Sequence, residues 1–288
     1  MALYEKIFEN AEHKIIHGES LEILCKMPND SVDLIFADPP YNIGKNFDGL
    51  IENWAQENFL EWCYTWIKEC HRVLKPTGTM YLMNSTENMP YLDIWCRKYF
   101  FIRSRIIWSY DSSGVQARNY YGSLYEPILM LVKNQKKYIF NAEDILVEAK
   151  TGAKRKLIDY RKNPPQPYNN LKVPGNVWEF PRVRFRMEEY ENHPTQKPEA
   201  LLERIIRASS NVGDVVLDPF SGSFTTSAVS KRLNRRSIGI EINEEYVKMG
   251  IRRLNLESHY NNEELKKIKK RKTTNLSKNN RDDELTLF

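Results

Sequence analysis

The chain has 288 residues, of which 41% are hydrophobic and 12% aromatic, so a globally disordered protein is excluded. No apolar run reaches the roughly 18 residues that a membrane-spanning helix needs, and the charged N-terminus carries no signal-peptide pattern. The four cysteines have neither CxxC spacing nor histidines at zinc-ligand spacing. We therefore expect a reduced, cytoplasmic protein without a structural metal.

The net charge of +5 is concentrated near the C-terminus. Residues 266–281 contain eight Lys or Arg and no acidic residue, so removing these eight charges from +5 leaves the rest of the chain at about −3. Such a tail can add salt-dependent affinity for nucleic acid by neutralising phosphates. A solvated, disordered end is an equally good interpretation of the tail alone.

In the first half of the chain, short apolar runs alternate with helix-like stretches, which predicts an α/β fold with a largely parallel sheet. The longest predicted helix covers 52–74. Trp54, Phe59, Trp62, Trp66 and Cys70 recur there at helical spacing, and we interpret them as a face toward the core rather than a cofactor site. The predicted strands are 14–17, 32–37, 79–84, 105–110 and 127–133.

Residues 111–192 have poor periodicity and are rich in Tyr, Arg, Asn and Pro. We predict an irregular insertion that displays basic and aromatic groups. Arg161, Tyr168 and Arg182 are candidates for base contact, although a structural role is the favoured interpretation of each one. The α/β alternation then resumes, so the chain predicts one sheet interrupted by a recognition module. The elements predicted there are a helix at 198–209, a strand at 214–217, a helix from 225, a strand at 237–242 and a helix at 243–256.

The tetrapeptide DPPY, residues 38–41, follows the apolar strand VDLIFA directly. Open α/β sheets bind their ligands at the carboxyl ends of their strands. The two prolines fix φ and remove both N–H donors, which leaves carbonyls that only accept hydrogen bonds. A carboxylate, outward carbonyls and an aromatic ring would suit an exocyclic amine on a flat ring. The plainer interpretation is an ordinary strand-ending turn.

A second turn, DPFSGS at 218–223, follows the strand DVVLD and precedes a predicted helix. Gly222 lets the backbone approach a ligand, and the helix N-terminus offers free N–H groups. Glu241 ends the next predicted strand, where an acid commonly binds a ribose diol. The pair predicts a cofactor that carries adenosine, and NAD or a nucleotide would fit this pattern equally well.

Taken together, the DPPY turn, the DPFSGS turn and the sequence HPTQKP at 193–198 resemble the S-adenosylmethionine-dependent amino-methyltransferases of DNA. The order, with DPPY first, resembles their β group, and the resemblance spans roughly residues 13–256. Longer strings such as MNSTENMP, NPPQPYN and VPGNVWEFPRV resemble an adenine-specific member of that group. The resemblance implies a Rossmann-like methyltransferase fold, with a mainly parallel seven-stranded sheet, helices on both faces and an inserted target-recognition region.

The resemblance also implies a division of the chain. The expected parts are the catalytic half of the methyltransferase domain at 1–110, the target-recognition region at 111–192, the cofactor-binding half at 193–260 and a basic tail at 261–288. The implied partner is double-stranded DNA, with no membrane and no metal, and a homodimer is expected by analogy. The expected location is cytoplasmic, on the nucleoid when DNA is bound.

The reaction implied by the resemblance moves a methyl group from S-adenosyl-L-methionine to N6 of an adenine flipped out of the duplex, by direct in-line attack. Asp38 and the carbonyl of Pro39 would accept the amine hydrogens, and Tyr41 would stack on the base. The implied catalytic residues are Asp38, Pro39, Pro40 and Tyr41. The implied cofactor-binding residues are Asp218, Phe220, Ser221, Gly222, Ser223, Thr225, Glu241, Ile242, Asn243, Thr195, Lys197 and Glu19.

Two positions depart from the family pattern. Glu19 stands where Asp is common, and Phe224 stands where a small residue is common. A bulky ring at position 224 predicts either a re-routed turn that weakens cofactor binding or a packed variant of the turn. N4-cytosine methylation uses the same geometry, although Asp38 in place of Ser favours adenine. A catalytically idle DNA-binding regulator and an NAD-dependent enzyme are the remaining alternatives.

Overall fold

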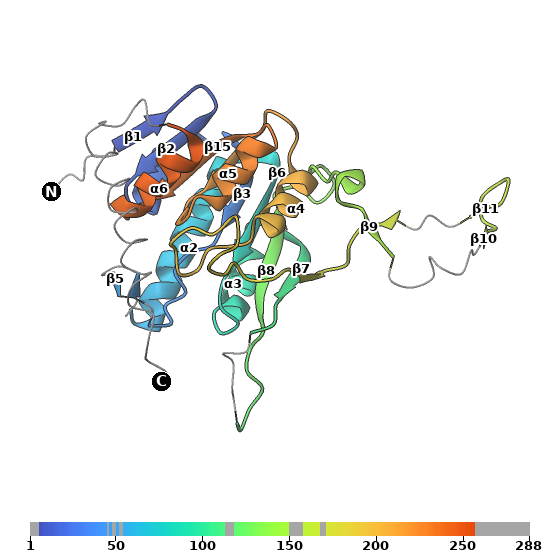
Figure 1. Cartoon of the computed structure of the whole chain (residues 1–288), viewed down its shortest axis with the longest axis horizontal. Coiled ribbons are helices and arrows are strands. Elements are labelled where there is room, and N and C mark those ends of the chain that lie inside the picture. Colours follow the sequence, from blue (N-terminus) through green and yellow to red (C-terminus); the bar gives the residue numbers. More distant parts are fainter. Residues whose placement is uncertain are drawn as a thin grey trace.

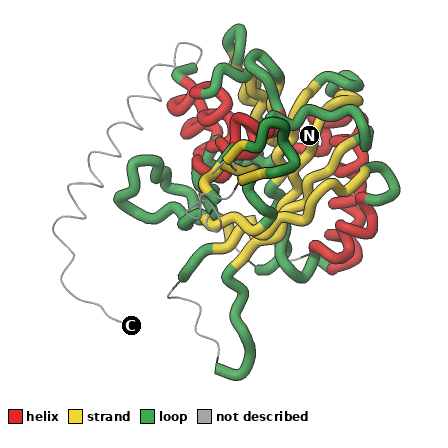
Figure 2. The backbone as a smooth tube through the Cα atoms, turned by 90° about the vertical axis from the view of Figure 1, so that its right-hand side faces the viewer, coloured by secondary structure: helices red, strands yellow, loops and turns green. Residues whose placement is uncertain are grey.

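The computed structural model describes residues 6–44, 46–47, 50–51, 54–112, 118–149, 158–167 and 171–256. The predicted basic tail at 261–288 and Tyr168 lie outside the described residues. The described residues are arranged around a single large sheet that carries helices on both sides (Figures 1 and 2).

The large sheet has nine strands among the described residues, in the order β1-β2-β15-β14-β3-β6-β8-β7-β13. Strands β2, β15, β14, β3 and β6 run parallel, whereas β8 is antiparallel to both β6 and β7. The α/β fold with a mainly parallel sheet is confirmed, and a short strand at each edge raises the expected seven strands to nine. The bounds are β1 (Lys6–Glu9), β2 (His13–His17), β3 (Val32–Ala37), β6 (Leu74–Met83), β7 (Phe101–Ser109), β8 (Tyr125–Val132), β13 (Val177–Glu179), β14 (Val215–Asp218) and β15 (Arg236–Glu241).

The central strand β3 shows why the sheet is covered on both faces. All six of its residues are buried, which is typical of a strand in the middle of a parallel sheet. Ile35 and Ala37 pack in a core with α1, α2 and α3, whereas Leu34 and Phe36 pack in a second core with α4 and α5. The helices are α1 (Ser20–Lys26), α2 (Gln56–Val73), α3 (Met89–Cys96), the 3-10 helix η1 (Ala142–Ile145), α4 (Glu199–Ser209), α5 (Thr225–Arg232) and α6 (Glu244–Leu254).

The segment 111–192 is less irregular than the sequence predicted. It contains β8 and β13, which both belong to the large sheet. Outside the large sheet, the other described strands are two residues long and form two-stranded pairs, of which β4 with β5 precedes this segment. The β10–β11 hairpin projects away from the large sheet (Figure 1). The pairs are β4 (Asn46–Phe47) with β5 (Leu50–Ile51), β9 (Val147–Glu148) with β12 (Leu171–Lys172), and β10 (Ile158–Asp159) with β11 (Gln166–Pro167).

Predicted boundaries differ from the structure at several elements, among them α2 and α6. Helix α2 begins at Gln56 instead of residue 52, so Trp54 precedes it. Leu74 begins β6 rather than ending the helix. Asn243 caps α6 from outside, because its side-chain oxygen accepts from the backbone N–H groups of Glu245 and Tyr246. An N-cap asparagine lies just before the helix and satisfies N–H donors that have no partner inside it. The sequence pattern had indicated Asn243 as the first helical residue.

Candidate active site

The sheet topology brings three acidic residues to one edge. Asp38 follows β3, Asp218 ends β14 and Glu241 ends β15. Strand β14 lies between the other two, and the three strands are parallel. Their carboxyl ends therefore meet at the same edge, where open α/β sheets bind ligands.

A cavity of about 640 Å³ opens at this edge. It brings together every residue predicted for the site, including both turns and the segment before α4. Aromatic rings, among them those of Trp54, Trp62 and Trp108, form much of the rest of its wall. The predicted residues that line it are Glu19, Asp38, Pro39, Pro40, Tyr41, Thr195, Lys197, Asp218, Phe220, Ser221, Gly222, Ser223, Thr225, Glu241, Ile242 and Asn243.

In the turn after β14, buried carboxylates are held mainly by backbone donors. Both oxygens of Glu241 accept at 2.8 Å, one from the N–H of Gly222 and the other from the N–H of Asn243. Asp218 accepts from the N–H of Phe220 at 3.0 Å and from the hydroxyl of Thr226 at 2.5 Å. Burial raises the pKa of Asp218 to about 7, although these hydrogen bonds oppose the shift.

Burial also raises the pKa of Glu241, against the lowering effect of its backbone donors. The two oxygens have four lone pairs between them, so hydrogen-bonding capacity remains for a ligand. Because backbone groups fix the carboxylate, its orientation is set before any ligand binds.

Gly222 is required by both conformation and space. Its φ is +47°, a left-handed value that side chains rarely adopt. A Cβ atom at this position would lie 2.8 Å from Nε2 of His193. The turn therefore packs directly against the HPTQKP segment, and a side chain at 222 would force the two apart.

Phe224 adopts a packed variant of the turn. Its φ is +57° and its side chain is fully buried beneath the cavity rather than in its wall. The ring fills space left by two distant glycines, because a Cβ at Gly239 would lie 2.7 Å from the ring and a Cβ at Gly250 would lie 2.6 Å from it. The bulky residue is thus accommodated by the absence of side chains on β15 and α6.

In the turn after β3, the contacts are made by side chains instead. The Tyr41 hydroxyl donates to Oδ1 of Asp38 at 2.6 Å and lies 3.0 Å from Oε2 of Glu126. Lys197 Nζ lies 2.5 Å from Oδ2 of Asp38 and 3.7 Å from the same Glu126 oxygen. Burial, together with the two carboxylates, raises the pKa of Tyr41 well above its usual range.

Lys197 carries the positive charge of this cluster. Burial lowers the pKa of its ammonium, but the carboxylates of Asp38 and Glu126 outweigh burial and raise the pKa overall. The predicted contact of Lys197 and Thr195 with a cofactor carboxylate stays a prediction. The structure gives Lys197 the partner Asp38, and the backbone N–H of Thr195 donates to Nδ1 of His193 at 3.3 Å.

Glu126 was missed by the sequence reading. It is the second residue of β8, which pairs antiparallel with β6, so the start of β8 lies at the carboxyl edge of the parallel strands. The orientation of a strand is not visible in its own sequence. A signal was present, namely a single acid at the entrance to the apolar run PILMLV.

The aromatic face of α2 was only partly interpreted correctly. Trp66 and Cys70 are fully buried in the core, as predicted. Trp54, by contrast, is 47% exposed and lines the cavity with Trp62. It is held there by Asn42, whose side chain donates to the carbonyl of Trp54 at 2.9 Å and accepts from its N–H at 3.0 Å.

Glu19 lies in the cavity wall and has a structural task as well. Its carboxylate caps α1 by accepting from the N–H of Glu22 at 2.8 Å. Glutamate at this position therefore serves the helix start. Its predicted contact with a cofactor adenine stays a prediction.

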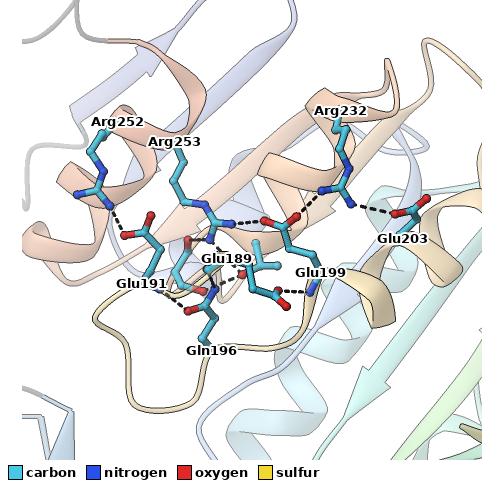
Figure 3. Close-up of polar contacts among 10 residues, drawn as sticks. Glu189, Glu191, Gln196, Glu199, Glu203, Arg232, Arg252 and Arg253 are labelled. Carbon is cyan, nitrogen blue, oxygen red and sulfur yellow. Dashed lines mark hydrogen bonds and ion pairs between the residues drawn. The ribbon is translucent and has the colours of Figure 1, made fainter. Parts of the chain in front are cut away.

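The segment that carries Lys197 is anchored on both sides (Figure 3). The Gln196 side chain donates to the carbonyl of Glu189 at 2.6 Å and accepts from the N–H of Glu191 at 2.7 Å. Arg253 of α6 joins the turn after β14 to the start of α4, since it donates to the carbonyl of Ser223 at 2.7 Å and to Glu199 at 2.9 Å. Further ion pairs join Arg252 with Glu191, and Arg232 with Glu199 and Glu203.

Among the described residues, no group of three or more His, Cys, Asp or Glu side chains is arranged to hold a metal ion. In the same part of the chain, no helix is both long enough and apolar enough to cross a membrane.

The sequence of this chain is similar to those of known DNA methyltransferases. A family model for DNA methylases, N6_N4_Mtase, matches residues 32–252. DNA adenine methyltransferase YhdJ of Escherichia coli (strain K12) is 69% identical over 95% of this chain and 93% of its own. Type II methyltransferase M.HpaI of Haemophilus parainfluenzae is 40% identical over 85% of this chain and 75% of its own.

Two solved structures have a fold similar to that of this chain. The M1.HpyAVI–SAM complex has a TM-score of 0.56 and 28% identity, and the match covers 84% of this chain and 99% of that one. PvuII DNA methyltransferase (cytosine-N4-specific) has a TM-score of 0.65 over 85% of this chain and 86% of its own. Its identity is 19%, so this second likeness shows the fold alone.

Proposed function

The chain belongs to the N6/N4 family of DNA methylases, and from this premise we propose a role for each part of the site. The protein is an S-adenosylmethionine-dependent DNA methyltransferase whose target is N6 of adenine. The observation that carries the choice of base is the 69% identity, over nearly the whole chain, with a DNA adenine methyltransferase. The family itself includes both N6 and N4 chemistry.

The residues around the cofactor turn fit S-adenosylmethionine. Two buried carboxylates, Asp218 and Glu241, stand at the ends of adjacent strands beside the ring of Phe220 in one cavity. Glu241 keeps lone pairs for a ribose diol, and the negative charge of the cavity favours a cationic ligand. When bound, the cofactor supplies an activated methyl group on a positively charged sulfur, which adenine N6 takes by direct in-line attack.

The DPPY turn would act on the target amine. Its lone pair is delocalised into the base, and acceptors for both hydrogens draw the nitrogen toward a tetrahedral shape. Asp38 and the carbonyl of Pro39 provide these acceptors, and the negative charge of Asp38 favours the positive charge that grows on nitrogen. The ring of Tyr41 would stack on the flipped base.

The segment 111–192 is proposed as the target-recognition region, between catalytic and cofactor-binding halves at 1–110 and 193–260. Near the cavity it displays basic and aromatic groups. Arg182 lines the cavity with its guanidinium 5.2 Å from the ring centre of Tyr110, and Arg184, Phe185 and Arg186 are exposed beside it. These side chains suit the phosphates and bases of double-stranded DNA around a flipped nucleotide. The proposed homodimer is tested by light scattering.

The reaction is tested by methyl transfer from labelled S-adenosylmethionine to unmethylated double-stranded DNA of varied sequence, followed by nucleoside analysis. We expect N6-methyladenine from the wild type and none from Asp38→Ala. N4-methylcytosine would retain the fold and geometry but reverse the base. A wild type that binds the cofactor and labels no DNA would favour the idle regulator.

A further inference from the structure

In this structure both carboxylate oxygens of Asp38 are engaged by side-chain donors. Tyr41 donates to one of its carboxylate oxygens at 2.6 Å, and Lys197 Nζ lies 2.5 Å from the other. The ammonium also offsets the negative charge that the proposed reaction needs beside N6. Moving the ammonium away from Asp38 when the base enters would restore this charge and free lone pairs for the amine hydrogens.

Glu126 is placed to receive both donors. One oxygen, Oε2, lies 3.0 Å from the Tyr41 hydroxyl and 3.7 Å from Lys197 Nζ. The Tyr41 hydroxyl has one hydrogen, so the two carboxylates compete for it. The Glu126 side chain is 17% exposed and that of Lys197 9%, so a charge that leaves Asp38 needs a second carboxylate rather than water.

The exchange requires side-chain movement only. Lys197 follows Gln196, which is hydrogen-bonded to Glu189 and Glu191, and precedes α4, whose first N–H, that of Glu199, donates to Glu189 at 2.6 Å (Figure 3). The backbone is thus fixed on both sides of Lys197. A shift of the flexible ammonium from 3.7 Å to direct contact with Glu126 leaves this frame intact.

We propose that Glu126 is a positioning residue that takes Lys197 and Tyr41 from Asp38 when the target adenine enters, so that Asp38 is released to accept the amino hydrogens. This inference rests on the proposed methyl transfer and adds a task to a residue outside the DPPY and DPFSGS motifs. Glu126 itself touches neither reacting atom. Its effect passes through Lys197 and Tyr41, which distinguishes it from a general base.

The test compares steady-state and single-turnover methylation of unmethylated plasmid DNA by the wild type, Glu126→Gln and Glu126→Asp. Glutamine keeps the size and removes the charge. We expect kcat to fall roughly tenfold to a hundredfold, with KM for both substrates within about twofold, because positioning of the reacting groups is lost. Glu126→Asp keeps the charge and is expected within about fivefold of wild type. Glu143→Gln, an exposed acid outside the cavity, is the matched control.

A double-mutant cycle with Lys197→Met isolates the proposed route. In that background Glu126→Gln should cost only about twofold, since the ammonium it would receive is gone. A structural role would give the same loss in both backgrounds and would overturn the proposal, as would an unchanged kcat or a weakened affinity for S-adenosylmethionine. If Glu126→Gln lowers the thermal midpoint below the assay temperature, the whole cycle is run at a temperature at which all variants are folded. A wild type without methyl transfer would instead refute the proposed function.

Discussion

The two turns of the site hold their carboxylates in different ways. After β14 and β15, Glu241 is fixed by two backbone N–H groups and Asp218 by one, together with a neighbouring hydroxyl. After β3, Asp38 is held by the side chains of Tyr41 and Lys197. Backbone donors cannot change partners without unfolding the turn, whereas side chains can. The first arrangement suits binding of a cofactor, and the second suits a reaction in which partners must exchange.

The largest effect is expected from removing the buried side chain that supports the turn at 218–223. Phe224→Ala removes a fully buried ring that fills the space beside Gly239 and Gly250. A large-to-small change of this kind costs about 3–5 kcal/mol. We expect the free energy of unfolding, measured by urea denaturation, to fall by that amount. Phe185→Ala, at a ring that is 70% exposed, should change it by less than about 0.5 kcal/mol. Equal effects would contradict the packed-turn account.

A smaller change tests the fit of the turn against the HPTQKP segment. Gly222→Ala places a Cβ 2.8 Å from His193 in a left-handed conformation. Strain of about 1–3 kcal/mol should weaken S-adenosylmethionine binding roughly tenfold to a hundredfold in calorimetric titration. Gly175→Ala meets nothing within 4 Å and is the matched control. Unchanged affinity in Gly222→Ala would mean that the turn adapts.

The DPPY turn is probed by removing one hydroxyl. Tyr41→Phe keeps the ring and deletes the donor shared by Asp38 and Glu126. In the proposed exchange the hydroxyl donates to Asp38 before the base enters and to Glu126 during transfer. Its loss removes a hydrogen bond from both states, so kcat and KM for DNA should stay within about threefold of wild type. Tyr41→Ala should in addition weaken DNA binding, because stacking contributes about 1–3 kcal/mol per base. Identical behaviour of the two variants would remove the stacking role.

The most gradual effect concerns pH. The pKa of Asp218 is raised to about 7 from 3.8, so the folded protein keeps a proton that the unfolded chain loses. This contribution to stability is complete below about pH 4 and is lost as the pH rises to about 7. The difference in unfolding free energy between wild type and Asp218→Asn should therefore fall by about 1 kcal/mol per pH unit in this window and level off above it. Parallel curves would contradict the shift.

The parts of the site that could be predicted are those that parallel strands place. Asp38, Asp218 and Glu241 each end an apolar run, and the rule that such ends share an edge locates all three. Glu126 escaped because the antiparallel direction of β8 depends on pairing with β6, not on its own residues. The space for Phe224 comes from Gly239 and Gly250, which are distant in sequence.

Edge strands were also missed. Strands β1 and β13 each bury one residue, so neither shows the apolar run by which the central strands are found. The contact between Lys197 and Asp38 could not be predicted from the sequence either, because the two residues are 159 positions apart and only the fold brings them together. The sequence pattern thus located the central elements, whereas the edge strands and the contacts between side chains required the structure.

The central claim is that cofactor binding and chemistry are separated between the two turns. The most direct measurement is calorimetric titration of Asp38→Asn with S-adenosylmethionine alongside single-turnover methylation of DNA. We predict a dissociation constant within about twofold of wild type and methyl transfer slowed by about 10²–10³-fold or more, since stabilisation of the charge on nitrogen is lost. Loss of cofactor affinity in parallel with activity, or full activity in the variant, would contradict the account.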